Sequence, residues 1–354
     1  MNWGILATGT IANKFATTIN AMAAEGERLA AVGSRRAESA KAFAAQYNIP
    51  HWYASYEELA ADPAVDAIYI ATPNALHYEN CRLCLEHGKH VLCEKPAGID
   101  YAAAKAMQQA QHETGKVLNI GVCNRYNASV GLIKKYIDSG ELGQVHHVYV
   151  SFRSFRSIPG LGGDFTTKAM AGGGALIDWG VHFFDIVMYC CSDPRVLTVS
   201  GEIFAKLGGA GYVYRDMWAG PPQENGTCDV EDSVTGLIRT EGPTISFNGA
   251  WAQNIDEEEL FIDFMGNQGG IRLQYGQDFT FYTTRYGALV KEKPEFKPNN
   301  MYEAEIDAFV RCIRTGEKQP NHIDVFLRTQ KLLEDIYRSA ALHREIAAET
   351  EEAP

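Results

Sequence analysis

The first 120 residues alternate short apolar runs with longer helical patterns, and this alternation limits the chain to few folds. Apolar runs occupy residues 3–7, 29–33, 67–71, 91–93 and 117–121. Helical patterns lie between them, among others over residues 11–24 and 37–46. Repeated strand–helix units form a parallel sheet with helices on both faces. We therefore expect an α/β fold that begins with a doubly wound Rossmann domain over residues 1–122.

The pattern changes after residue 122. Alternating apolar residues appear at 145–152, and further strand-like runs lie at 198–204, 230–239, 244–251, 259–265 and 270–273. Helices are predicted at 130–138, at 175–191 and, on either side of residues 315–316, within 302–341. We expect residues 123–354 to form an α+β domain with a large, mainly antiparallel open sheet for substrate binding and oligomerisation. Its C-terminal helices are expected to pack back on the first domain.

Composition excludes several classes of partner. The net charge of −12 argues against nucleic acid and anionic membranes, which both require a basic surface. No apolar run approaches the roughly 18 residues of a membrane helix, and no signal-peptide pattern opens the chain. Eight cysteines without regular spacing are typical of reduced thiols, so we expect a cytoplasmic protein. No His, Asp and Glu residues cluster at convincing ligand spacing, so no metal is required.

A glycine-containing loop follows the first apolar run. Gly9 permits a tight turn, and Ala12 keeps the next helix close to the sheet. The N-terminus of that helix favours phosphate through its free N–H groups and dipole. We expect this loop to bind a dinucleotide pyrophosphate through Ala7, Thr8, Gly9, Thr10 and Ile11. The motif departs from G-x-G-x-x-G/A, because Ala7 takes the place of its first glycine.

The end of the second apolar run bears on the choice of cofactor. NAD-preferring sites usually place Asp or Glu here, whereas this chain has Ser34, Arg35 and Arg36. A hydroxyl and two guanidinium groups suit a 2′-phosphate, so NADP is favoured and NAD remains the alternative. Both arginines also fit as solvated residues at the start of a helix.

Three further segments resemble one enzyme family. They are Thr72-Pro73-Asn74 followed by His77, Glu94-Lys95-Pro96, and residues 172–174 followed by Asp178 and His182. With the loop above, they resemble the glucose-fructose oxidoreductase / inositol dehydrogenase (Gfo/Idh/MocA) family over nearly the whole chain. The resemblance implies an NAD(P)-dependent oxidoreductase. Such an enzyme transfers a hydride between the nicotinamide and a secondary hydroxyl or ketone of a sugar, cyclitol or related polyol.

The resemblance also implies roles for individual residues. Lys95 would hydrogen-bond the reacting hydroxyl, and Glu94 would lie near the nicotinamide ribose. Thr72, Pro73 and Asn74 would lie beside the same ribose, with His77 as a neighbour of the cofactor loop that caps or packs.

Asp178 and His182 are four residues apart on a predicted helix and share one face of it. His182, or Lys95, would receive the hydroxyl proton, and Asp178 would orient the imidazole or bind a second hydroxyl. A buried structural pair is the alternative interpretation.

Other residues are candidates for substrate contact, namely Asn124, Arg125, Tyr126, Arg153, Arg156, Asp185 and the loop 164–168. Family members commonly bury the open sheet between subunits, so a homodimer or homotetramer is expected. Three other functions remain open: a redox-assisted glycosidase or epimerase with a recycled cofactor, a dihydrodiol dehydrogenase, and a non-catalytic dinucleotide or sugar sensor. The sequence does not identify the sugar, the carbon oxidised or the direction of reaction.

Overall fold

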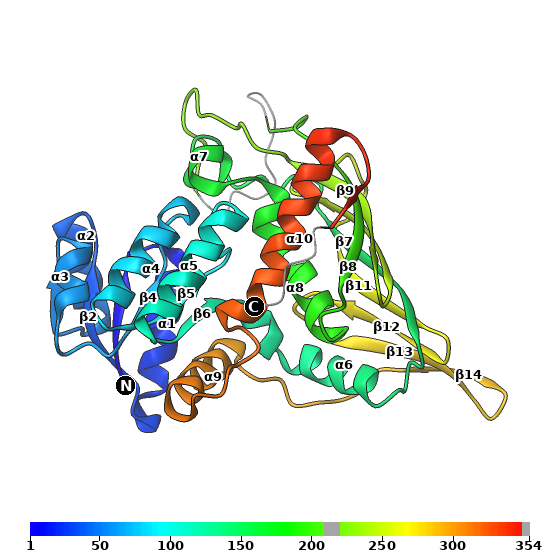
Figure 1. Ribbon diagram of the computed structural model, residues 1–354, viewed down its shortest axis with the longest axis horizontal. Helices are drawn as coiled ribbons and strands as arrows, with labels where there is room; N and C mark the ends of the chain where they lie inside the picture. Colours follow the sequence, from blue (N-terminus) through cyan, green and yellow to red (C-terminus); the bar gives the residue numbers. More distant parts are fainter. Residues whose placement is uncertain (209–219, 349–354) are drawn as a thin grey trace. The chain divides into compact units, whose positions relative to one another are not determined.

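A computed structural model describes residues 1–208 and 220–348 of the chain, and the elements below are those of these residues (Figure 1). The chain divides into two compact units. Unit 1 combines Met1–Tyr126 with Asn300–Leu327, and unit 2 combines Asn127–Asn299 with Arg328–Pro354. Part of the predicted C-terminal helical pair therefore belongs to the same unit as the Rossmann residues.

Unit 1 contains a parallel sheet with the strand order β3-β2-β1-β4-β5-β6. Its strands are β1 (Asn2–Leu6), β2 (Arg28–Gly33), β3 (His51–Tyr53), β4 (Ala67–Ile70), β5 (His90–Glu94) and β6 (Leu118–Gly121). Its helices are α1 (Thr10–Ala21), α2 (Ala37–Tyr47), α3 (Tyr56–Ala61), α4 (His77–Glu86), α5 (Tyr101–Thr114) and α9 (Met301–Thr315). The strand order reverses between β1 and β4, and the crevice beyond the carboxyl ends of such strands is where doubly wound folds bind ligands. The predicted Rossmann fold is confirmed.

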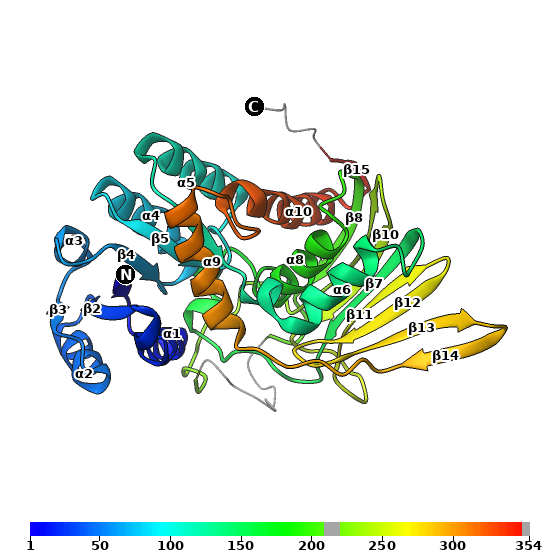
Figure 2. The ribbon, with the colours of Figure 1, turned by 90° about the horizontal axis from the view of Figure 1, so that it is seen from below.

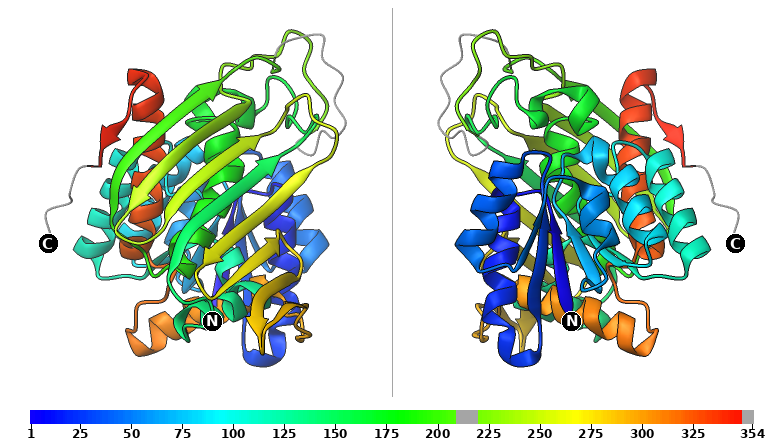
Figure 3. Two further views of the ribbon diagram at one scale, coloured as in Figure 1. Left: turned by 90° about the vertical axis from the view of Figure 1, so that its right-hand side faces the viewer. Right: turned by 90° about the vertical axis from the view of Figure 1, so that its left-hand side faces the viewer.

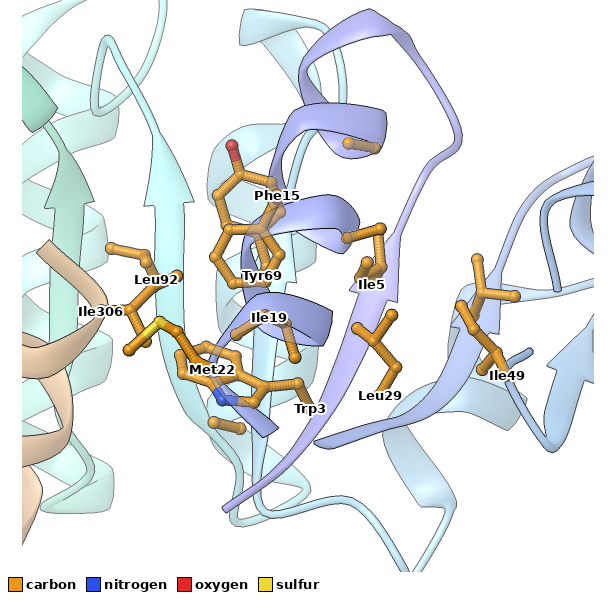
Figure 4. Close-up of a cluster of buried hydrophobic side chains, with 14 of the residues drawn as sticks. Trp3, Ile5, Phe15, Ile19, Met22, Leu29, Ile49, Tyr69, Leu92 and Ile306 are labelled. Carbon is orange, nitrogen blue, oxygen red and sulfur yellow. The ribbon is translucent and has the colours of Figure 1, made fainter. Parts of the chain in front are cut away.

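The helices of unit 1 cover both faces of the sheet. Helices α1 and α2 lie on one face, and α4 and α5 lie on the other (Figure 2). The core on the α1 face contains the fully buried Trp3, whose ring packs edge-on against Phe15 (Figure 4). The Trp3 ring also lies beside Phe309 of α9. Burial of aromatic side chains of this size contributes strongly to stability. Helix α9 is therefore part of the Rossmann core, although it begins only at Met301, far beyond the last parallel strand in the sequence.

Unit 2 contains a mostly antiparallel sheet with the order β14-β13-β12-β11-β7-β10-β9-β8-β15, in which only the β7–β10 pair among the described strands is parallel. Its strands are β7 (Val145–Arg153), β8 (Val196–Phe204), β9 (Ser233–Thr240), β10 (Thr244–Ala250), β11 (Glu259–Gly266), β12 (Gly269–Gln274), β13 (Phe279–Arg285), β14 (Ala288–Glu292) and β15 (Ile346–Ala347). Its helices include α6 (Ala128–Asp138), α7 (Lys168–Ala171), α8 (Val181–Cys190) and most of α10 (Ile323–Leu342). The predicted α+β architecture is confirmed.

Among the residues that the structure describes, helices lie over one face of the unit 2 sheet only (Figure 3). Val148, Val150 and Phe152 alternate along β7 as buried residues, and Phe152 packs against Phe183 of α8. Figure 3 shows the opposite face without a helix across it. Strand β13 and the two edge strands, β14 and β15, were not predicted from the sequence. In β13 only Phe279 and Phe281 alternate as buried residues before the strand becomes polar, and β14 is mostly exposed, so neither carries the long apolar alternation of the other strands.

Candidate active site

The loop after β1 leads directly into α1 at the point where the strand order reverses. Gly9 lies before the first helical residue, and a Cβ added to it would meet no atom of the described residues within 4 Å. No side chain caps α1, and no acidic residue lies in its first turn. The helix therefore begins with free N–H groups and open space, which suits a phosphate.

Ala7 has a left-handed backbone, with φ +84°, and its N–H donates to the carbonyl of Gly33 at 2.9 Å. Left-handed backbone is easy for glycine and unfavourable for residues with a Cβ. The conformation explains why the motif normally has glycine at this position. The loop keeps the motif geometry, and Ala7 is strained in it.

The end of β2 presents Ser34, Arg35 and Arg36, of which Ser34 is buried and both arginines are exposed. Ser34 N–H donates to the Tyr53 carbonyl, which fixes the turn. Burial raises the pKa of Tyr56, and a hydrogen bond with Arg35 partly offsets this rise. Arg36 precedes the first residue of α2.

The loop after β4 is fixed to the loop after β5 by His77. His77 is fully buried, with Nδ1 2.7 Å from the Pro96 carbonyl and Nε2 2.9 Å from the Thr72 carbonyl. Both partners are acceptors, so a neutral ring can satisfy only one of them. Burial lowers the pKa of His77, and the two carbonyl groups partly offset this. Both nitrogens are therefore used within the protein, and we place His77 among the residues that hold the loops.

Thr72, Pro73 and Asn74 follow β4 as predicted, with residues 74–76 forming a 3₁₀ turn. The Thr72 hydroxyl accepts a hydrogen bond from Asn80 Nδ2 at 3.1 Å. This bond ties the loop to α4.

Glu94 is the last residue of β5, and Lys95 follows it at the carboxyl edge of the sheet. The hydroxyl of Tyr69, on the neighbouring strand β4, donates a short hydrogen bond to Glu94. Tyr69 in turn stacks on Phe15, with ring centroids 3.7 Å apart. Burial raises the pKa of Glu94, and the Tyr69 hydrogen bond and nearby Lys95 lower it. Lys95 is half-buried and precedes a cis peptide bond to Pro96.

Arg125 and Tyr126 lie in a short 3₁₀ turn that follows β6. Arg125 Nη1 donates to the Pro320 carbonyl, and the Tyr126 hydroxyl donates to Asn321 Oδ1. Asn321 also pairs with the backbone of Ile120. Both side chains therefore attach the segment before α10 to the edge of the sheet.

In unit 2, Asp178 lies in a π-helical turn, Leu176–Gly180, and His182 lies in α8 directly after it. The expected helix over 175–191 is therefore not a uniform α-helix, and the spacing of four residues spans a change of helical pitch. The side chain of Asp178 is buried, and its Oδ2 accepts a hydrogen bond from Trp251 Nε1 at 3.1 Å. Single π turns inside helices are frequent at functional sites.

The rest of α8 and the neighbouring sheet hold the other predicted residues. His182 is half-buried, with its ring centroid 6.4 Å from that of Tyr275. Asp185 is buried and accepts a hydrogen bond from Thr329 on α10. Arg153 faces Glu259 across the β7–β11 pair and lowers the pKa of that carboxyl through their hydrogen bonds.

The nearby loops have internal partners as well. Arg156 donates to the carbonyl oxygens of Phe155 and Gln253. Residues 164–166 of the loop before Asp178 form a 3₁₀ turn, and Lys168 begins α7.

Three residues that support the site were not found from the sequence. Tyr69, Glu231 and Trp251 bond to Glu94, to residues 174–176 and to Asp178. Glu231 lies 57 residues from Gly174, and Trp251 lies 73 residues from Asp178. Sequence spacing carries no signal for such pairs. Of the three, only Tyr69 has a signal in its local sequence, because it is a polar ring within an apolar strand.

In residues 1–208 and 220–348, no group of three or more His, Cys, Asp and Glu side chains is placed to hold a metal ion. None of the helices in the same ranges combines the length and hydrophobicity that crossing a bilayer requires.

Comparison with known proteins places both units. Residues 1–122 match the model of an oxidoreductase family with an NAD-binding Rossmann fold, and residues 130–272 match the GFO/IDH/MocA C-terminal domain. D-glucoside 3-dehydrogenase of Escherichia coli is 27% identical over 88% of each chain. Trans-1,2-dihydrobenzene-1,2-diol dehydrogenase of Mus musculus is 32% identical over 57% of this chain and 60% of its own.

A solved structure gives the same answer for the fold. The structure of levoglucosan dehydrogenase in complex with NADH and L-sorbose aligns over 99% of both chains, with a TM-score of 0.88 at 20% identity. The two domain models match in the order in which the motifs occur along this sequence. The chain therefore belongs to the Gfo/Idh/MocA family of NAD-binding oxidoreductases, as its sequence motifs indicate.

Proposed function

We propose that this protein is an NADP-dependent dehydrogenase that interconverts a secondary hydroxyl and a ketone on a sugar or related polyol. The observation that carries the proposal is the place of Lys95. It follows β5 directly, at the carboxyl edge of the same sheet whose β1 and β4 ends carry the phosphate-type loop and Thr72–Asn74. A cation at this edge supports the chemistry of an alcohol, because it stabilises negative charge that develops on oxygen.

The residues of unit 1 fit a dinucleotide. The start of α1 has free N–H groups and an open position at Gly9, where a backbone can approach a pyrophosphate closely. Ala7, Thr8, Thr10 and Ile11 form the rest of this loop. When bound, the nicotinamide supplies the acceptor or donor of the hydride.

Preference for NADP rests on the end of β2. Arg35 and Arg36 are exposed there, and Ser34 takes the place where an NAD site usually has a carboxylate. Two guanidinium groups and a hydroxyl recognise a 2′-phosphate better than a 2′-hydroxyl.

Lys95, His182 and Asp178 would each have a separate role in the reaction. Lys95 hydrogen-bonds the substrate oxygen and stabilises it as the C–H bond breaks. His182 takes the hydroxyl proton during oxidation and returns it during reduction. Asp178, held by Trp251, orients the imidazole or binds a neighbouring hydroxyl.

The substrate class follows from the family and from one relative that spans most of the chain. That relative is named for a D-glucoside and for oxidation at carbon 3. We extend the glycoside class to this protein. A variant of the proposal begins with the same oxidation of a hydroxyl group. It then returns the hydride to the substrate within one catalytic cycle, so the cofactor is recycled and there is no net oxidation.

A second candidate function is oxidation of a trans-dihydrodiol. It is favoured by the 32% identity to trans-1,2-dihydrobenzene-1,2-diol dehydrogenase, which spans little more than half of this chain. Both functions use vicinal hydroxyl groups and the same cofactor half of the site. A substrate panel distinguishes them directly.

Assembly and location complete the proposal. The sheet face without a helix carries Tyr149, Phe261 and Tyr282, and we propose that a second copy of the chain covers it in a homodimer or homotetramer. None of the eight cysteines, all of which lie in the described residues, forms a disulfide bond, which supports a reducing compartment such as the cytoplasm.

The test begins with fluorescence titration of the full-length protein with NADP and NAD. Methyl glucosides, free aldoses, inositols and a trans-dihydrodiol are then screened for reduced-cofactor absorbance. Lys95→Ala should lower turnover by about 10³-fold, the size typical for loss of a donor that stabilises negative charge on the reacting oxygen. Lys105→Ala, an exposed lysine on α5, is the matched control and should behave as wild type. Absence of binding to either dinucleotide would overturn the proposal.

A further inference from the structure

One buried carboxylate holds the start of the helical segment that carries Asp178. Glu231 is 5% exposed and lies two residues before β9. Its Oε2 accepts from Gly174 N at 2.8 Å, its Oε1 accepts from Leu176 N at 3.0 Å, and its main-chain oxygen accepts from Ala175 N at 3.1 Å. Three successive N–H groups at the start of this segment, which would otherwise lack partners, are thus satisfied by one residue.

A tyrosine completes the arrangement from α10. The Tyr337 hydroxyl donates to Glu231 Oε1 at 2.8 Å. Glu231 therefore receives two N–H donors and one O–H donor on its carboxylate, all from groups that need an acceptor. Burial raises the pKa of Glu231, while the N–H groups of Leu176 and Gly174 and the Tyr337 hydroxyl lower it. An acceptor-only carboxylate fits this set of donors, and a carboxamide does not.

The glycines before Asp178 allow these bonds to form. A Cβ on Gly174 would overlap the main-chain oxygen of Glu231, and a Cβ on Gly173 would overlap the Tyr337 hydroxyl. The glycine run is therefore a packing requirement of the Glu231–Tyr337 pair.

The segment that contains Glu231 also positions the partner of Asp178. Trp251 N donates to the Asp232 carbonyl at 2.9 Å, and Trp251 Nε1 donates to Asp178 Oδ2. Asp178 N donates to Gly174 O at 3.0 Å, so its backbone depends on the turn that Glu231 holds. Ala175, Val230 and Trp251 belong to one cluster of buried hydrophobic residues. Residues 230–232 thus fix both the backbone and the side chain of Asp178.

We propose that Glu231, with Tyr337, is a positioning residue for the reaction. It acts through the helix start and so sets where Asp178 and His182 lie. The inference rests on the proposed function, because Asp178 and His182 matter only if they serve that chemistry. It adds a residue from outside the three motifs to the site.

Hydrogen exchange tests the arrangement without any substrate. In the full-length protein, Glu231→Gln should speed amide exchange in a peptide that covers residues 174–182, because an amide nitrogen would then face an N–H or O–H donor. Asp232→Asn is the matched control. The Asp232 carboxylate accepts from Lys206, Leu207 and Gly208, so the control should speed exchange there and leave 174–182 protected.

Turnover tests the positioning role. With a sugar that wild type oxidises, Glu231→Gln should lower kcat about 100-fold, the size expected when catalytic groups move by about 1 Å. The Kd for NADP should not change, because the dinucleotide loop lies in unit 1. Tyr337→Phe removes one donor and should lower kcat on the order of tenfold. Glu27→Gln alters a buried carboxylate in unit 1 and should lower stability but not kcat.

Each outcome decides the inference. Faster exchange at 174–176 together with a fall in kcat at unchanged NADP affinity supports it. Wild-type exchange in that peptide, or wild-type kcat, in Glu231→Gln overturns it. If Glu231→Gln does not fold, the same two measurements on Tyr337→Phe decide. If wild type oxidises no substrate, the proposed function fails, and the exchange experiment alone decides whether Glu231 holds the segment.

Discussion

Gly9 in unit 1 and Gly173–Gly174 in unit 2 both belong to motifs of the candidate site, but their surroundings differ. A Cβ on Gly9 would meet no described protein atom within 4 Å, whereas a Cβ on Gly173 or Gly174 would overlap Tyr337 or Glu231. Gly9 leaves room for a molecule outside the fold. Gly173 and Gly174 make room for the fold itself.

This difference separates two reasons for a glycine motif. In unit 1 no described protein atom lies close to the missing side chain of Gly9, and we propose that this space serves the cofactor. In unit 2 the missing side chains let a distant carboxylate and hydroxyl reach the helix start. Substitution by alanine should therefore damage binding in one unit and stability in the other.

The largest effect is expected from Gly174→Ala. Its Cβ would collide with the main-chain oxygen of Glu231, which cannot move without disturbing the start of β9. The free energy of unfolding should fall by about 3 kcal/mol, as for overpacking of a tight interior. Chemical denaturation measures this value, and a variant as stable as wild type would show that the segment is not held as described.

Gly9→Ala should have the opposite signature. The backbone φ of Gly9 is −75°, which alanine adopts readily, so the free energy of unfolding should not change. The Kd for NADP should rise about 30-fold, which corresponds to roughly 2 kcal/mol. Parallel denaturation and fluorescence titration give both values. If Gly9→Ala lowers the free energy of unfolding and leaves the Kd for NADP unchanged, the two glycine motifs do not differ in the way described.

Ala7→Gly is a gain-of-stability prediction within the same loop. Ala7 has φ +84°, a conformation that costs a residue with a Cβ about 1 kcal/mol relative to glycine. The variant should unfold at higher denaturant concentration while NADP affinity stays at or above that of wild type. A less stable variant would contradict the backbone conformation assigned to this turn.

The two units also differ in their carboxylates, and a carboxylate of unit 1 is expected to have the smallest effect on stability. Glu231 is a buried acceptor in unit 2, whereas Asp324 in unit 1 is half-buried and bonded to Lys318 and Gln108. Burial opposes ionisation of Asp324, but these bonds outweigh it and lower its pKa from 3.8 to about 2. Because the folded pKa is the lower one, the stabilisation is present above about pH 4 and is lost as the pH falls towards 2.

Asp324→Asn should therefore lower the melting temperature at pH 7 by a small amount. The difference from wild type should close between about pH 4 and pH 2, where wild type loses the charge as well. Melting curves across this range provide the check. If the two melting temperatures still differ near pH 2, the effect does not come from the charge of Asp324.

The sequence predicted what local pattern and motif order determine. The alternation of apolar runs located β1 to β6 apart from the short β3, and the motifs located Lys95, Asp178 and His182 on the elements where they are observed. It did not predict the π turn at Leu176–Gly180, whose first N–H group donates to Glu231, a residue far along the chain. It also missed Tyr69 and Trp251, whose roles arise only from tertiary contacts.

Hydride transfer itself is the central claim, and isotope transfer tests it most directly. The protein, in molar excess, is mixed with NADP and a methyl glucoside that carries deuterium on its ring carbons, and the cofactor is analysed by mass spectrometry after one turnover. We expect one deuterium atom in the reduced cofactor with wild type and none with Lys95→Ala. A cofactor that binds but gains no deuterium from any sugar or diol of the panel would contradict the account.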